Sequence, residues 1–509
     1  MLVGVAQRRR RPPTDGPWEP VEPAKMMAEA IQDAARDAGD LALLQEADVL
    51  ACVQPVAWTY DDLVPRVGRL AGVTGPTSPH MPTGLTVAPG GNSPCQLLND
   101  IADRIVDGDA RIALLTGAEA MYSRRRARNE EIDLFGRGWP PRPQEVSRLG
   151  GQRPLTNELE ARHGVTMPIQ AYPLYENALR AEAGRSIPEH MAFLGELMAA
   201  HAEVARTNPF AWFQDGWTAE QLTTVDADNR WICFPYPKRM NAIIDVDQAA
   251  ALVVMSSDEA DRRQIPPGRQ VAFLGGASAT DAWTPTERAS LTSSPAYRAA
   301  ASAAFEHAGL YPTEVDGFDL YSCFPCAVQF AMKALSLTLD DPRPRTVTGG
   351  LAYAGGPGNN YSTHALAAMV ERLRSSPGRV GYVSALGMTA TKHAVSILSA
   401  DPTRAKGSSG RSTPAVAVPD RVNFGPPLVD LPAAGPASIE TYTVEFDRRS
   451  QPVRSMLVLR MGDGRRTMAN GLLTDVAHLV GDEGVGLRGW VEPGSDGGPN
   501  RFSLGTPSL

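Results

Sequence analysis

Two patterns of apolar positions alternate along the first 400 residues. Helical spacing of small and apolar residues covers "MMAEAIQDAARDAG", which ends at Gly39, and "CQLLNDIADRIVDG", which follows the turn "TVAPGGNSP". Short continuous apolar runs, "ADVLACVQP" and "ARIALLTGAEA", come after each helix. The spacing predicts amphipathic helices and the runs predict buried strands. A glycine just after the last periodic residue is a usual helix end.

The same order of elements occurs a second time. "YRAAASAAFEHAG" and "YSTHALAAMVERLRSSPG" have helical spacing, "VDGFDLYSCFP" and "RVGYVSALG" have strand character, and the turn "GGLAYAGGPGNN" precedes the second helix. Such a repeat indicates a duplicated unit. Helices that alternate with internal strands predict an α/β sandwich. We expect its two halves to pack about a pseudo-twofold axis, with their glycine turns close together.

Two stretches interrupt the pattern and divide the chain. Residues 121–240 mix polar runs with a long helical segment and predict an inserted loop domain, after which "QAAALVVMSSDEA" resumes the first half. A Gly/Ser/Pro-rich linker is followed by short runs that alternate with period two, which predicts a small all-β domain. The expected first half covers residues 1–120 and 241–277, with the loop domain inserted at 121–240. The second half covers 278–402, the linker 403–418 and the β domain 419–509.

Composition narrows the class of protein. The chain has 509 residues, 43% of them hydrophobic and 21% charged, and a net charge of −8, as in a soluble globular protein of two or three domains. No apolar run approaches the roughly 20 residues of a membrane span, and the start lacks a signal-peptide core. Five scattered cysteines predict no disulfide framework and a reducing, cytoplasmic location. Cys323 and Cys326 form a CxxC without a second pair, so we expect no metal.

Five segments together carry a resemblance to a known family. They are "IVDGDARIALLTGAEAMYS", "NPFAWF", "DLYSCF", "GGLAYAGGPG" and "SALGMTATKHA". In their order and spacing the chain resembles the thiolase superfamily, most of all its sterol-carrier-type, acetyl-CoA acetyltransferase-like and thiolase-like (type 1) branch, over about residues 1 to 400. The resemblance implies the thiolase fold, a duplicated five-layer αβαβα sandwich with an inserted loop domain. It also implies a CoA-thioester ligand and four loops that meet in one pocket.

The first two of these loops differ from the family at their reactive positions. The family's nucleophile turn, CxS, falls on residues 91–93, so Gly91 stands in the place of the cysteine and Ser93 is kept. Cys95 lies inside the predicted helix, where we expect it to pack rather than react. The family's NEAF or HDCF loop is "YSCF" here, with Tyr321 in the Asn/His position and Ser322 in the acidic position.

The other two loops differ as well. The family's GHP is "GGP" here, which puts Gly356 in the place of the imidazole, and CxG is "ALG", which puts Ala385 in the place of the second cysteine. Claisen chemistry on a thioester needs a nucleophile, a base beside it and an acid/base for the α-carbon. The four positions retain none of the family's reactive groups. We therefore assign no catalytic residue and expect neither thiolysis nor condensation. Smaller groups at Gly91, Gly356 and Ala385 also predict a wider, less polar pocket.

A few residual groups could still act. Tyr321 could donate a hydrogen bond to a thioester carbonyl or serve as an acid in carbon–carbon cleavage, with Tyr361 as partner, or its ring could simply fill space. Ser93 is a third candidate, and His364 and His393 are expected to be hydrogen-bonded structural histidines. No cofactor is required. We expect a surface that binds CoA or acyl-CoA through backbone N–H groups. The residues that form it are Gly91, Asn92, Ser93, Gly355, Gly356, Gly358 and Gly387.

Three functions follow as hypotheses. The first is a thiolase-like protein that binds an acyl-CoA or related lipid-like thioester without turning it over. The second is a lyase or acyltransferase of altered mechanism that uses Tyr321. The third is a scaffold that binds a partner through the C-terminal domain, whose strands resemble an oligonucleotide/oligosaccharide-binding (OB) barrel.

The basic runs at residues 8–11 and 124–131 bear on the partners. They fit either a solvated surface or contacts with CoA phosphates. Nucleic acid is not an expected partner, although the hairpin "GDGRR" leaves it open for the C-terminal domain. We expect a monomer or a homodimer.

Overall fold

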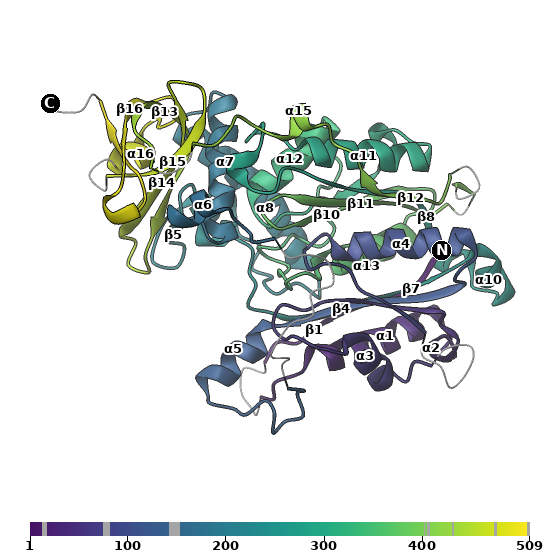
Figure 1. Cartoon of the computed structure of the whole chain (residues 1–509). Coiled ribbons are helices and arrows are strands. Elements are labelled where there is room, and N and C mark those ends of the chain that lie inside the picture. The colour runs from purple at the N-terminus through teal and green to yellow at the C-terminus, as the bar shows by residue number, and fades with distance from the viewer. Residues whose placement is uncertain are drawn as a thin grey trace.

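The computed structural model describes residues 1–12, 18–74, 82–141, 153–401, 403–404, 408–429, 432–472 and 476–505 (Figure 1). Its main body has five layers, in which two sheets enclose a central pair of helices and carry further helices outside (Figure 1). The predicted duplicated α/β sandwich is confirmed. The first sheet has the order β1 (Leu2–Arg9), β7 (Asp247–Met255), β4 (Ile112–Ala120), β2 (Val49–Val53) and β3 (Thr83–Leu85).

The second sheet repeats this plan in the second half of the chain. Its order is β12 (Ser412–Val416), β8 (Ala272–Thr280), β11 (Lys392–Ser399), β10 (Val380–Gly387) and β9 (Gly317–Asp319). Nearly every residue of the inner strands of both sheets is buried, which explains why these strands are continuous apolar or small-residue runs rather than alternating ones.

Helices cover both faces of each sheet. The central pair consists of α4 (Ser93–Asp107) and α13 (Tyr361–Arg374), and the outer helices are α1 (Pro23–Ala38), α2 (Leu43–Glu46), α3 (Leu63–Ala71), α10 (Ser257–Arg262), α11 (Pro295–Ala308) and α12 (Pro325–Leu335). The predicted end at Gly39 is confirmed, because this residue adopts the left-handed conformation with φ 84°. Gly108 and Gly309 end α4 and α11 in the same way.

Part of the loop segment and the C-terminal segment pack together at one end of the molecule, whereas α5 (Met121–Asn129) lies by the first sheet (Figure 1). The loop segment contains α5, α6 (Glu158–Arg162), α7 (Pro168–Glu182), α8 (Ile187–Thr207), α9 (Ala219–Thr223), β5 (Trp231–Cys233) and β6 (Tyr236–Pro237). The C-terminal segment contains α15 (Asp420–Asn423), β13 (Gly435–Phe446), β14 (Pro452–Met461), β15 (Arg466–Gly471), α16 (Val476–Gly481), β16 (Arg488–Glu492) and β17 (Arg501–Leu504).

The five C-terminal strands close into a barrel. Neighbouring strands pair in the order β14-β15-β17-β16-β13, and β13 pairs with β14 to complete the ring. This arrangement confirms the predicted OB-like all-β domain. Closure leaves few free edges, since each strand finds a partner on both sides over part of its length.

Two strands do not follow the expected division of the chain. Residue 277 lies inside β8, whose pairing with β11 in the second sheet begins at Ala272. The expected linker 403–418 contains β12, which pairs in parallel with β8 from Ser412 to Val416. Both strands are held by partners far away in sequence, and local composition does not report such partners. Residues 405–407 of the linker lie outside the described residues.

The barrel shares its core and its sheet with the loop segment. Strand β13 pairs with β5 at Glu445 and Cys233, so β5 and β6 extend the barrel sheet. Phe234 is fully buried inside the barrel cluster and stacks on Tyr442 at 6.1 Å between ring centroids. The amide of Asn177 on α7 donates to the Tyr442 carbonyl at 2.9 Å. The barrel is therefore packed into the body rather than tethered to it.

Phe234→Ala tests this shared core. Removing a buried aromatic ring leaves a cavity that costs about 3 to 5 kcal/mol. We therefore expect a lower unfolding temperature and faster proteolytic release of fragments from residues 420–505, measured by thermal unfolding and by mass spectrometry of digests. Phe135→Ala is the control, because that ring is 56% exposed. A barrel that resists protease equally in both variants would contradict the shared core.

Candidate functional site

A buried carboxylate organises the loops that the sequence singled out. Asp319 ends β9 and has no exposed surface. Its Oδ2 accepts the backbone N–H groups of Val347 at 2.9 Å and Thr348 at 3.1 Å, and the hydroxyls of Thr346 and Thr348 at 3.0 Å each. Burial raises the pKa of Asp319, and these hydrogen bonds oppose the rise. The strand end and the start of the glycine loop are thereby fixed to each other.

Tyr361 connects this carboxylate to the centre of the site. It is the first residue of α13, and its hydroxyl donates to Asp319 Oδ1 at 2.9 Å and lies 2.6 Å from Thr348 Oγ1. Its ring meets the Tyr321 ring edge to face, with 5.4 Å between centroids and an interplanar angle of 85°. The two tyrosines predicted to be partners do lie together, but the Tyr361 hydroxyl is engaged by Asp319.

Tyr321 occupies the space beside Gly91. A Cβ atom added at Gly91 would overlap with the Tyr321 hydroxyl oxygen and the Leu386 carbonyl oxygen, and would lie 2.8 Å from Tyr321 Cζ. The Tyr321 backbone N–H donates to Ser384 Oγ at 3.1 Å, and the side chain is 7% exposed. Burial raises the pKa of Tyr321 well above its usual value, so the phenol stays protonated.

The expectation of a wider pocket is therefore wrong at Gly91. The tyrosine and a backbone carbonyl fill the volume that a larger residue there would need. Gly356 is little roomier, since an added Cβ would lie 3.2 Å from the Ile243 carbonyl oxygen, and Ala385 is fully buried in β10. The four predicted slots are thus close-packed rather than hollow.

The remaining glycines of the loop are also faced by polar side chains. A Cβ at Gly355 would overlap with Gln248 Oε1, and one at Gly358 would overlap with Glu119 Oε2; both glycines have positive φ, 112° and 52°. Glu119 accepts backbone N–H groups of Val56 and Ala57 at 2.8 Å each. Burial raises the pKa of Glu119 to about 7. Glycine is needed here because other elements press against this loop.

The predicted backbone surface around α4 holds together by its own hydrogen bonds. The Ser93 hydroxyl donates to the Gly90 carbonyl at 2.6 Å, which gives Ser93 a part in closing the turn. The Asn92 amide donates to Gln96 Oε1 at 2.9 Å. Ser362 donates to the Gly91 carbonyl at 3.4 Å, which confirms that the two glycine turns lie side by side. Gly387 packs directly against Asn92.

The cysteines considered as reactive or metal-binding are buried and free. Burial raises the pKa of Cys95 and of Cys323 to about 12, so neither thiol ionises near neutral pH. Cys326 donates its S–H to the Tyr172 carbonyl, with 3.5 Å between the sulfur and the oxygen. The described part of the chain contains no cluster of three or more metal-ligating side chains. It also contains no helix long and apolar enough to cross a membrane.

The two histidines are held inside the protein. His393 Nε2 lies 2.9 Å from the Ala390 carbonyl and 3.1 Å from Asp281 Oδ2. His364 Nδ1 lies 3.1 Å from Gln7 Oε1, and the residue sits in the first turn of α13. Burial lowers the pKa of His364 to about 3.

Three arginines of the basic runs lie at the surface in ion pairs. Arg8 contacts Glu29 at 2.8 Å, Arg125 contacts Asp245 at 2.7 Å and Arg126 contacts Glu130 at 2.6 Å. These three charges are balanced by carboxylates of the protein itself, which favours the solvated-surface interpretation for this part of the runs.

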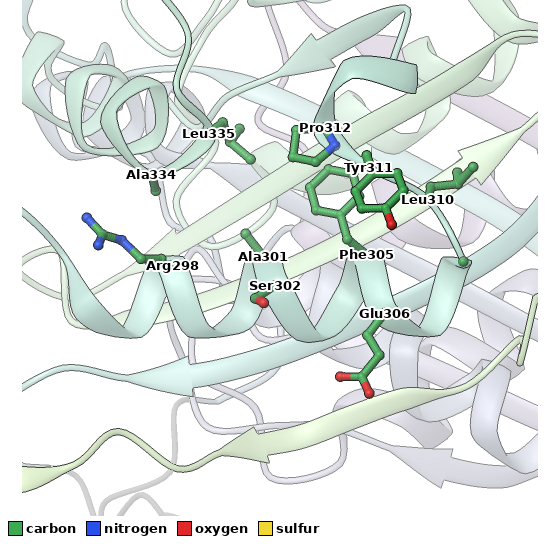
Figure 2. A pocket seen from close by; sticks show the side chains of 11 residues that line it. Arg298, Ala301, Ser302, Phe305, Glu306, Leu310, Tyr311, Pro312, Ala334 and Leu335 are labelled. Carbon is green, nitrogen blue, oxygen red and sulfur yellow. The ribbon is translucent and has the colours of Figure 1, made fainter.

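A surface groove of about 540 Å³ lies away from these loops. It runs along α11 and the turn that follows, with Phe305, Leu310 and Tyr311 at one end and Arg298 at the other (Figure 2). None of the predicted slots lines it. The groove is therefore separate from the candidate site.

Sequence reasoning missed two residues that shape the site. Asp319 directly precedes the "LYSCF" segment, and an acidic residue at the end of a buried strand is the signal that could have revealed it. Lys392 lies within "SALGMTATKHA" and packs against Gly90 and Gly387, with its Cε 2.9 Å from a Cβ added at Gly90. Glycines at both positions make room for this side chain.

Comparisons with known proteins agree with the fold. Residues 420–497 match the family model of the thiolase-like protein type 1 additional C-terminal domain. The chain is similar to a monomeric SCP2-thiolase-like protein type 1 from Mycobacterium smegmatis, with 29% identity, a TM-score of 0.79 and coverage of 99% of this chain and 98% of that one. No curated protein matches the sequence.

Thiolases themselves are more distant. The acetyl-CoA acetyltransferase from Syntrophomonas wolfei has 16% identity and a TM-score of 0.52, and human mitochondrial 3-ketoacyl-CoA thiolase has 15% identity and a TM-score of 0.53. In each case the match covers 78% of this chain and 98% of the other. The predicted resemblance and the predicted fold are confirmed.

Gly91→Ala tests the close packing at the first slot. An added methyl group would overlap with the Tyr321 hydroxyl and a backbone carbonyl, so we expect a loss of stability of about 1 to 3 kcal/mol. Tyr321→Phe in the same chain should restore part of it, because the two changes touch each other. Gly268→Ala is the control, since a Cβ there meets nothing within 4 Å. Thermal unfolding of the unmodified chain and of these three variants measures the differences in stability. Equal losses for Gly91→Ala and Gly268→Ala would contradict the packing.

Because His364 is buried in its neutral form, we expect the protein to lose stability in acid. Its pKa rises from about 3 in the folded protein to the usual 6.5 on unfolding, so the unfolded chain binds the proton more tightly. The neutral His364 ring makes its full contribution to the free energy of unfolding above pH 6.5. This contribution falls as the pH drops towards 3, and roughly 2 to 3 kcal/mol is lost at pH 4.5. Urea unfolding at pH 7.5 and 4.5 should show a smaller loss in His364→Gln. The exposed His478→Gln variant should behave like the unmodified protein, and an equal acid loss in both variants would refute the assignment.

Proposed function

We propose that this chain, which has the thiolase fold and a type 1 thiolase-like C-terminal domain, binds a CoA thioester or related lipid-like acyl compound and neither thiolyses nor condenses it. One observation carries the second half of the proposal. The Tyr321 hydroxyl and the Leu386 carbonyl occupy the space where the side chain of a nucleophile at position 91 would stand. A reactive thiol there would need a different neighbour as well as a different residue.

The other slots support the same conclusion. Gly356 and Ala385 provide no base or acid, and Cys95 is buried with a pKa of about 12. Removing a nucleophile and its base together usually lowers the rate by several orders of magnitude. The Ser93 hydroxyl is used in its own turn and the Tyr361 hydroxyl is held by Asp319.

Binding of a thioester is supported by the fold and by two helix starts. The similar solved structures include enzymes named for acetyl-CoA and 3-ketoacyl-CoA. The helices α4 and α13 begin at this site without a side-chain cap from Asn92 or Asn360. In α13 the first N–H groups can meet a carbonyl or an anion, whereas in α4 the Ser93 N–H already donates to the Gly90 carbonyl. Since three arginines of the basic runs pair with carboxylates, the acyl part should contribute more than the nucleotide.

A lyase that uses Tyr321 is the second candidate. The observation in its favour is that burial keeps the phenol protonated, as an acid must be, beside a second tyrosine linked to a carboxylate. Against it, the Tyr321 hydroxyl is packed against Gly91. A scaffold role becomes the better interpretation if no thioester binds.

The proposal also covers the cellular location and the oligomeric state. The five free, buried cysteines fit a reducing compartment, so we propose a cytoplasmic location. A monomer is the proposed state, because the similar protein from Mycobacterium smegmatis is described as monomeric.

Assay and calorimetry test the two halves separately. We expect no thiolysis of acetoacetyl-CoA above background and no change on Cys95→Ala. Affinity should rise along an acyl-CoA series by about fourfold per buried methylene, the equivalent of roughly 0.8 kcal/mol, and free CoA should bind weakest. Turnover abolished by Cys95→Ala would show that the nucleophile is misplaced, and turnover abolished by Tyr321→Phe would favour the lyase. Affinity that ignores acyl length would favour the scaffold.

A further inference from the structure

A cavity of about 260 Å³ lies at the N-terminal end of α4, where this helix passes β8, β11 and β12 (Figure 1). Its polar lining comes from three elements: Asn92 and Gln96 at the start of α4, Ser278 and Thr280 on β8, and Lys392 and His393 on β11. Ala88 of the first glycine turn and Pro414 and Val416 of β12 supply apolar wall. The cavity thus combines one cation, several hydrogen-bonding groups and a partly apolar wall.

Lys392 places the cation between this cavity and the closed loops. Its ammonium group donates to the Pro89 carbonyl at 2.9 Å and the Ala88 carbonyl at 3.2 Å. An ammonium group has three N–H donors, so one is left for a ligand. The side chain is partly buried, which makes its charge harder to hydrate and lowers the pKa of Lys392 to about 8. An anion in the cavity would compensate for this lost hydration.

Ser278 is an unpartnered hydroxyl on the same wall. The residue is 7% exposed, and its Oγ has no hydrogen-bond partner in the structure. Gly276, two residues earlier on β8, faces Asn99 of α4, so the alternation along a strand turns Ser278 towards α4 as well. A buried hydroxyl left without a partner costs stability, which a ligand with a hydrogen-bonding group would recover.

Asn92 presents a second unpartnered group. It is 3% exposed, and its Oδ1 accepts no hydrogen bond although its Nδ2 donates to Gln96. This oxygen can accept a hydrogen bond from a hydroxyl of a ligand. The N-terminus of the 15-residue helix α4 starts one residue later and adds a partial positive charge.

The wall made by β12 is built into the fold. Ser412 donates its backbone N–H and its hydroxyl to the carboxylate of Asp103 on α4, at 2.8 and 2.6 Å, and Arg411 pairs with Asp107 at 2.8 Å. These contacts hold β12 against both α4 and β8. The cavity therefore has a fixed third side.

We propose that this cavity binds a small hydroxycarboxylate, with the carboxylate at Lys392 and the N-terminus of α4 and the hydroxyl between Asn92 and Ser278. The ligand must be small, because the cavity of about 260 Å³ has the volume of roughly nine water molecules. This proposal does not depend on binding of a CoA thioester.

Three matched probes test it on the full-length protein. 3-Hydroxybutyrate carries both groups, butyrate lacks the hydroxyl and 3-hydroxybutanamide lacks the charge. An amine-reactive reagent labels exposed lysines, and peptide mass spectrometry reads the rate at each position. We expect millimolar 3-hydroxybutyrate to slow labelling of Lys392, butyrate to protect it less and the amide to fail. Labelling of exposed Lys25 should not change.

Variants separate binding from folding. Ser278→Ala should weaken protection about three- to tenfold, the loss expected for one hydrogen bond, without lowering the unfolding temperature, because its hydroxyl has no partner to lose. Ser396→Ala is the matched control: its hydroxyl donates to Asn99 at 2.9 Å, so stability should fall while protection persists.

Lys392→Met, read by calorimetry, should abolish binding of 3-hydroxybutyrate. Equal protection by the amide, no protection at all, or protection unaffected by Ser278→Ala would overturn the proposal. Loss of acyl-CoA binding with intact protection, or the reverse, would affect only one of the two proposals.

Discussion

The closed site depends on one desolvated carboxylate. Asp319 has no contact with water, and hydroxyl and backbone N–H donors from a threonine-rich turn and from α13 must therefore satisfy its oxygens. A buried charge or acid tolerates few other arrangements, because each lost partner leaves a polar group exposed to an apolar interior. The requirement fixes where α13 begins, and so where the Tyr361 ring stands. The Tyr321 ring packs against it and reaches Gly91.

Many helices and strands could be predicted from the sequence because the patterns that indicate them are local. Helical spacing followed by glycine located α1, α4 and α11, and apolar runs located β2, β4, β7, β9 and β10. The buried strands β1, β8 and β11 were missed. Two further missed strands depend on their pairing. β12 has an exposed, mixed sequence and is a strand because β8 offers an edge, and β5 has only three residues and exists because β13 lies beside it.

Part of the candidate site could be predicted from the sequence, but Asp319, Lys392 and the shape of the site could not. Sequence reasoning brought Gly91, Tyr321, Tyr361 and Gly356 to one region, and the first three do lie together. It also assumed that a small residue leaves a hole. At Gly91, Gly355 and Gly358 the opposite holds, since a side chain from another element fills the space each time. Close packing makes volume a property of a neighbourhood, so one position cannot report it.

The strand contact between the barrel and the loop segment has a consequence for how binding energy is used. Residues 233 and 445 belong to one chain, so their pairing is intramolecular. The covalent connection through one chain gives the two surfaces an effective concentration in about the millimolar range, far above that of a separate subunit in dilute solution. Contacts that would be too weak to hold two free proteins then keep the barrel docked. Dilution cannot dissociate it, and the barrel's outer face is presented to other molecules at one fixed orientation.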